Sequence, residues 1–196
     1  KEQEKYQKMI RTALNSCSSR GKSLFYLKLA AQLEKAPVSM IIKKSLKYNI
    51  SANLIGSSFK QGQPSENKRL IIWAELLTLL INESYQIKKK AAAVAADLND
   101  PLILVSLKKM LLKRNELKLD FQTQYFLLDL LAAFGTGAAD FSPLLRKIIT
   151  EESDPWLKYH AVQAYLKIAV NEEEYEDFIK KVRAKEKEPV LLALGD

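Results

Sequence analysis

Residues 142–170 read SPLLRKIITEESDPWLKYHAVQAYLKIAV, and this stretch decides the fold class of the chain. It predicts a short amphipathic helix, a tight turn at Asp154 and Pro155, and a second helix. Proline at the first helical position loses no hydrogen bond, and the preceding aspartate can cap free N–H groups. At spacings of three and four residues, the second helix carries one apolar stripe, formed by Leu157, Ala161, Ala164, Tyr165 and Ile168.

Two such helices cannot bury their apolar faces alone, so they need similar neighbours stacked on both sides. Helical periodicity continues along the chain, and strict alternation of the strand type is absent. The sequence therefore predicts an all-α fold of about eleven helices, built as an α-α superhelix of stacked antiparallel helix pairs. Besides the two helices above, the predicted helices are 2–14, 23–33, 38–48, 51–59, 68–81, 86–98, 101–114, 120–134 and 171–187, with a last apolar turn at 190–194.

Turn signals divide the helices. The polar stretch 60–67, KQGQPSEN, predicts a flexible connection inside one helical-repeat domain spanning 1–196. It would separate N-terminal helices, 1–60, from repeats over 68–196. Asp100 with Pro101 and Ser142 with Pro143 repeat the cap-plus-proline signal of the Asp154 turn.

A repeat is visible when the second helices of the pairs are aligned. The pattern of residues 157–164 matches that of residues 87–94 at an offset of 70 residues, twice 35. Residues 121–128 fit between them if the alignment slips by one position. The equivalent residues are Leu157, Lys158, Ala161 and Ala164 against Ile87, Lys88, Ala91 and Val94, with Phe121, Tyr125 and Leu128 between.

The segment 140–170 resembles a HEAT repeat, in which an Asp-Pro turn precedes a helix that opens with an aliphatic-basic pair and small residues. The resemblance extends more loosely over 68–170 and fades before residue 60. No Asp-Pro precedes Ile87, and Gln122 and Thr123 replace the aliphatic-basic pair of the middle repeat. The resemblance implies an α-α superhelix of a class that serves mainly as protein scaffolds, with some members that bind nucleic acid.

The net charge of +8 is unevenly distributed. Residues 1–100 hold 17 Lys and Arg against 8 Asp and Glu, whereas residues 101–196 hold 14 against 15. A basic front half fits an acidic protein, a nucleic acid or an anionic membrane, although a lysine-rich codon bias would give the same composition. The candidate contacts to a partner or to phosphates are the strongest basic clusters, Lys88, Lys89, Lys90, Lys109, Lys113 and Arg114.

Residues with catalytic chemistry are scarce. His160 is the only histidine and Cys17 the only cysteine, so we expect no metal centre of the usual kind, no cofactor and no catalytic set. A packing role is the expectation for His160, and a salt bridge between helices for Asp129, which lies in an apolar run. A HEAT-like DNA glycosylase family uses an acidic residue and tryptophans in a basic groove. Its motif does not match here, but it makes Trp73, Asp129 and Trp156 the alternative groove residues.

The sequence thus predicts a non-enzymatic scaffold that binds a protein partner, with nucleic-acid binding, glycosylase-like or not, as the alternative. No run reaches the roughly 18 apolar residues of a membrane span, so we expect no transmembrane segment. The lone cysteine fits the cytoplasm. The chain starts with Lys1 and not methionine, so a processed or exported form fits as well, and the compartment and oligomeric state stay open.

Overall fold

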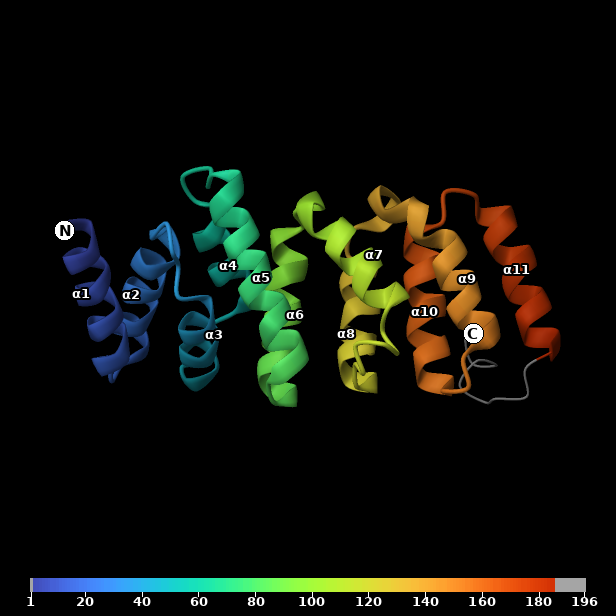
Figure 1. The fold of residues 1–196 in the computed structure, drawn as a ribbon, viewed down its shortest axis with the longest axis horizontal. Helices are drawn as coiled ribbons and strands as arrows, with labels where there is room; N and C mark the ends of the chain where they lie inside the picture. Colours follow the sequence, from blue (N-terminus) through green and yellow to red (C-terminus); the bar gives the residue numbers. More distant parts are fainter. Residues whose placement is uncertain (1, 186–196) are drawn as a thin grey trace. The chain divides into compact units, whose positions relative to one another are not determined.

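A computed structural model describes residues 2–185 and shows an all-helical protein (Figure 1). Over these residues it contains eleven α-helices, two short 3-10 helices and no strand, which confirms the predicted all-α class. The predicted helix end at 187 and the apolar turn at 190–194 lie outside the described residues.

The chain divides into two compact units, with the boundary between Asn99 and Asp100. The predicted connection 60–67 lies within the first unit, where a turn of residues 61–65 joins two helices. Gly62 and Gln63 have positive φ there, +79° and +49°, which makes this turn tight.

In the first unit, three helices form a row in which α2 packs on α4 and α4 on α6. The other three pack against that row: α1 on α2, α3 on α2 and α6, and α5 on α6. The bounds are α1 Glu2–Ser16, α2 Arg20–Gln32, α3 Val38–Lys47, α4 Ala52–Lys60, α5 Glu66–Asn82 and α6 Tyr85–Leu98.

In the second unit, α10 is the central helix and packs on α8, α9 and η2. All five residues of its predicted apolar stripe are at most 2% exposed, so this prediction is confirmed. The bounds are η1 Pro101–Ile103, α7 Leu104–Leu112, α8 Phe121–Ala132, η2 Gly135–Phe141, α9 Ser142–Glu151, α10 Pro155–Ile168 and α11 Glu172–Lys185.

Two of the three predicted aspartate or serine caps form. Asp154 accepts a hydrogen bond from the N–H of Leu157 at 2.6 Å, and Asp100 accepts one from the N–H of Leu102 at 3.1 Å. The prediction for Ser142 is wrong, because η2 runs directly into α9. Phe141 already has helical dihedrals, φ −88° and ψ −8°, so Ser142 lies inside the helix.

Serine or aspartate stands at the N-cap of five helices, the even-numbered ones from α2 to α10, at similar intervals along the chain. Ser19, Ser51, Ser84, Asp120 and Asp154 precede α2, α4, α6, α8 and α10 at intervals of 32, 33, 36 and 34 residues. The interval of 36 residues between Ser84 and Asp120 moves the middle segment of the sequence alignment by two residues, so that it starts at Thr123 and not at Phe121. Counted from the caps, Gln124 and not Gln122 or Thr123 corresponds to the two repeat lysines.

These corresponding positions share an unusual burial. Lys88, Gln124 and Lys158, each four residues after its N-cap, are 4%, 5% and 8% exposed. Long polar side chains are rarely buried, so these three positions stand out within their helices. Among the described residues, no helix combines the length and hydropathy that crossing a bilayer requires.

Candidate functional site

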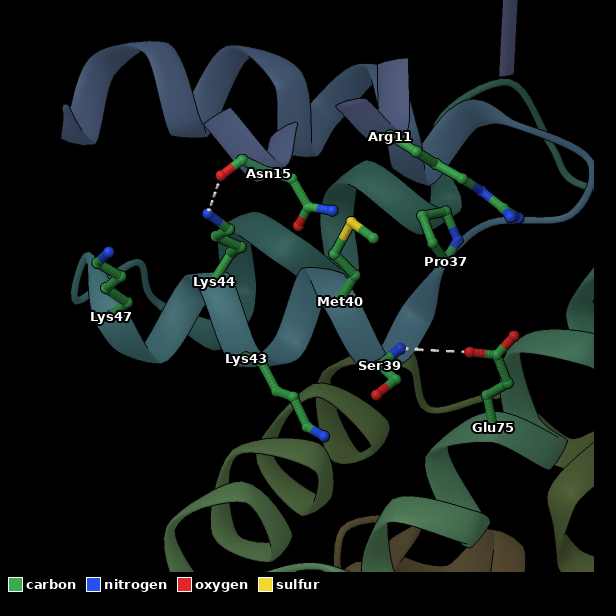
Figure 2. A pocket seen from close by; sticks show the side chains of 9 residues that line it. All are labelled: Arg11, Asn15, Pro37, Ser39, Met40, Lys43, Lys44, Lys47 and Glu75. Carbon is green, nitrogen blue, oxygen red and sulfur yellow. Dashed lines mark hydrogen bonds between the residues drawn. The ribbon is translucent and has the colours of Figure 1, made fainter. Parts of the chain in front are cut away.

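An open groove of about 640 Å³ lies in the first unit, against α1, α3 and α5 (Figure 2). We call it the α1–α3 groove. Its lining combines cationic side chains with an apolar floor and includes one carboxylate. The lining residues are Arg11, Asn15, Pro37, Ser39, Met40, Lys43, Lys44, Lys47 and Glu75.

Helix α3 supplies most of this lining because it is strongly amphipathic. Its apolar face, which includes Val38, Ile41 and Ile42, is fully buried in the unit. The groove residues Met40, Lys43, Lys44 and Lys47 follow the spacing i, i+3, i+4 and i+7, which places them together on another face of the helix.

Two side-chain hydrogen bonds connect the helices that line the groove, and each of them satisfies a backbone group near a helix end. Lys44 Nζ donates to the backbone oxygen of Asn15 at 2.7 Å, and so satisfies a carbonyl in the last turn of α1 (Figure 2). Glu75 Oε2 accepts from the N–H of Ser39 at 3.2 Å, in the first turn of α3. The cap of that helix is Pro37, which makes no side-chain cap bond, so Glu75 supplies the missing acceptor.

The charges of the groove are only partly compensated. Lys43 Nζ pairs with Glu83 Oε1 at 2.7 Å. Arg11 donates to the backbone oxygen of Lys35, and Lys44 to that of Asn15, so both bind neutral carbonyls and keep their full charge. Lys47 lies 5.5 Å from the ring centroid of Tyr48. The groove is therefore cationic and can bind an anionic group beside an apolar one.

The predicted lysine run 88–90 does not form one basic surface. Lys88 is buried, and Lys90 Nζ donates to the backbone oxygen of Ile50. Burial lowers the pKa of Lys90 below its ordinary value. Of the three, only Lys89 is exposed.

Two of the three predicted basic residues of the second unit form ion pairs. Lys113 pairs with Glu116 at 3.1 Å, and Arg114 pairs with Glu152 and donates to the backbone oxygen of Leu111. Lys109 is exposed.

Arg11, Lys43, Lys44 and Lys47 are not among the residues predicted from the sequence, because the prediction selects the clusters at 88–90 and 108–114 as the strongest. The signal was the helical spacing of Met40 and the three lysines in residues 38–47.

The three alternative groove residues belong to different units and differ in exposure. Trp73 is buried in the first unit, with 4% exposure, whereas Asp129 and Trp156 lie on α8 and α10 of the second unit, and both are about half exposed. Asp129 Oδ1 is 2.7 Å from Nδ1 of His160, so a polar contact connects α8 and α10 at this point. Within the described part of the chain, no group of three His, Cys, Asp or Glu side chains is placed to hold a metal ion.

Comparison of the chain with protein-family models, with curated proteins and with solved structures gives no match.

Proposed function

We propose that this protein is a non-enzymatic, HEAT-like helical scaffold whose α1–α3 groove holds an acidic segment of a protein partner. The observation that carries the proposal is the pairing of uncompensated cations with an apolar floor. Arg11, Lys44 and Lys47 provide the charge, and Pro37 and Met40 provide the apolar contact. An acidic segment with one apolar side chain matches both features.

The HEAT-like part of the proposal is supported by the regular N-caps and by the buried polar residues Lys88, Gln124 and Lys158. A recurring cap followed by a recurring buried position is the mark of a repeated helix pair, and stacked pairs bury one another's apolar faces. Arrays of this kind offer extended surfaces for binding.

Nucleic-acid binding is the alternative, since the front half of the chain is basic. Single strands are bound by a cationic track together with aromatic rings on which bases stack. The α1–α3 groove is lined by no aromatic ring, and its cations are concentrated on two turns of α3 and on Arg11. Lys88 is buried, and Lys90 donates a hydrogen bond to the backbone oxygen of Ile50. These features favour a peptide.

The proposal predicts that charge reversal in the groove weakens binding of an acidic peptide. A fluorescein-labelled peptide, DEELFEED, is titrated with the wild type and with the double variant Arg11→Glu/Lys47→Glu, and binding is followed by fluorescence anisotropy. We expect about a tenfold loss of affinity, because each exposed ion pair contributes roughly 0.2–1 kcal/mol and is replaced by a repulsion.

The matched control is Lys22→Glu/Lys89→Glu, which makes the same change in net charge at exposed positions outside the groove. An equal loss in the control would show that the peptide responds to net charge alone and would overturn the proposal. Preferential binding of an oligothymidylate of about twelve nucleotides, with an affinity that falls steeply with salt, would favour the nucleic-acid alternative.

A further inference from the structure

Helices α8 and α10 of the second unit present a cluster of rings along their line of contact. We call it the α8–α10 aromatic face. From α8 come Phe121 and Tyr125, one helical turn apart, and from α10 come Trp156, Tyr159 and His160. Unlike the buried apolar stripe of α10, this face carries two rings that are largely exposed to solvent, Phe121 and Trp156.

The rings are held in fixed geometry. Phe121 lies 6.4 Å from Tyr125 at an interplanar angle of 24°, and Tyr125 lies 4.7 Å from His160 at 12°, so these three rings are nearly parallel. Tyr159 meets His160 edge-on at 5.7 Å and 87°, and Trp156 meets Tyr159 edge-on at 6.1 Å and 74°. Such stacked and edge-to-face contacts are the favoured arrangements of aromatic pairs.

Two carboxylates anchor the central pair of rings. Asp154 Oδ1 accepts from the Tyr125 hydroxyl at 2.8 Å, and Asp129 Oδ1 is 2.7 Å from Nδ1 of His160. Burial, followed by the hydrogen bond to Asp154, raises the pKa of Tyr125 well above its ordinary value, so the phenol remains a neutral donor. Each of the two carboxylates therefore lies in direct contact with one ring of the face.

This face is exposed although it is ordered by its own contacts. Phe121 is 53% and Trp156 54% exposed, and the side chain of Asp129 is 50% exposed. A ligand would meet rings that are already oriented, so binding would cost little side-chain entropy.

We propose that the α8–α10 aromatic face binds the guanidinium group of an arginine in a basic segment of a protein partner. Aromatic faces attract cations, and arginine stacks on rings while donating to carboxylates. A purely apolar segment would bury the half-exposed carboxylate of Asp129 and offer it no hydrogen-bond donor, which is costly. Nucleic acid phosphates are acceptors like the two carboxylates and would offer them no donor either. The inference is independent of the α1–α3 groove, because it concerns another unit and a ligand of opposite charge.

The chain allows a direct test because it contains two tryptophans, one on this face and one in a core. The full chain is labelled with fluorotryptophan and titrated with the peptide acetyl-GSRGRSG-amide while fluorine NMR is recorded. We expect the Trp156 resonance to shift saturably and that of buried Trp73 to stay in place. The same peptide with citrulline for arginine keeps the shape but loses the charge, and it should not saturate over the same concentrations.

The same titration, repeated with single-residue variants, shows which residues bind the peptide. Phe121→Ala and Asp129→Asn should each weaken binding roughly two- to five-fold, the size expected for one exposed cation–π contact or ion pair. The matched controls are Phe25→Ala, an equally exposed phenylalanine of the first unit, and Glu151→Gln, an exposed carboxylate of α9. Urea unfolding followed by circular dichroism reports whether each variant is folded.

Three results would overturn the inference. These are equal binding of the citrulline peptide, an equal loss of affinity in the two controls, and the absence of any shift of Trp156 at millimolar arginine peptide. A saturable shift of Trp156 by oligothymidylate but not by the arginine peptide would also overturn it, and would indicate base stacking.

Discussion

Replacing Tyr165 by alanine is expected to lower the free energy of unfolding of the second unit by about 3–5 kcal/mol, the range for a large buried aromatic residue. Tyr165 is 2% exposed. Its ring centroid lies 5.4 Å from that of Tyr175 and 5.5 Å from that of Phe178, both on α11. The substitution would therefore remove the contact surface of α11 as well as leave a cavity.

Arg146 of α9 contacts the Tyr165 ring and connects it to α11. Its Nε donates to the Tyr165 hydroxyl at 2.8 Å, its guanidinium lies 5.3 Å from the centroids of Tyr165 and Phe178, and it pairs with Glu174 at the start of α11. Without Tyr165, α11 keeps the arginine contacts and the packing of its buried residues Ile179 and Val182, but it loses its contact with the aromatic ring. We expect its amide protons to exchange with solvent much faster than those of α10.

Urea unfolding followed by circular dichroism, with hydrogen exchange resolved by helix, measures both effects. Tyr165→Phe is the control, since it keeps the ring and removes only the hydroxyl. It should cost about 0.5–1.5 kcal/mol, the contribution of one hydrogen bond. If the alanine variant lost no more stability than the phenylalanine variant, α11 would be held by contacts other than this ring.

The helices of the second unit were predictable because local rules agree with the tertiary packing. Asp154 and Asp100 cap their helices as their sequences predict, and the stripe on α10 is buried as its spacing predicts. Ser142 shows where the local rule fails. Its cap signal is overridden because the 3-10 helix of residues 135–141 leads into α9 with no extended residue between them.

The basic groove could not be predicted from runs of consecutive basic residues, because consecutive side chains on a helix point in different directions. In the run 88–90, one lysine is buried, the next is exposed, and the third reaches the carbonyl of Ile50. The α1–α3 groove instead unites Arg11, the lysines of α3 and Glu75, which are distant in sequence and meet only through packing.

The aromatic face depended on helix register in the same way. Asp129, Trp156 and His160 stand out in the sequence one by one, but their meeting depends on the position of α10 beside α8. The caps Asp120 and Asp154 lie 34 residues apart, and this register brings Tyr125 over His160. The sequence alignment of Phe121 with Leu157, an offset of 36 residues, is wrong by two residues, and this error hides the pairing.

The replacement Gly56→Ala is expected to destabilise the first unit by about 2 kcal/mol, although alanine is the better helix former by about 1 kcal/mol. A Cβ added to Gly56 in α4 would lie 2.0 Å from Oδ2, 2.8 Å from Cγ and 3.1 Å from Cβ of Asp97 in α6. Rotation of the carboxylate relieves the first two contacts but not the third. The helices α4 and α6 must therefore separate, and overpacking of this kind costs about 1–3 kcal/mol.

Gly21→Ala in α2 is the matched control, because its added Cβ would meet no atom within 4 Å. It should stabilise the protein by about 0.5–1 kcal/mol through helix propensity alone, so the two substitutions are expected to act in opposite directions. Urea unfolding of both variants gives the comparison. In an Asp97→Gly background most of the cost of Gly56→Ala should disappear, since the Cβ atom that the new methyl group meets is then absent. A Gly56→Ala protein as stable as the wild type would show that α4 and α6 are not packed this closely, and the row formed by α2, α4 and α6 would need to be redrawn.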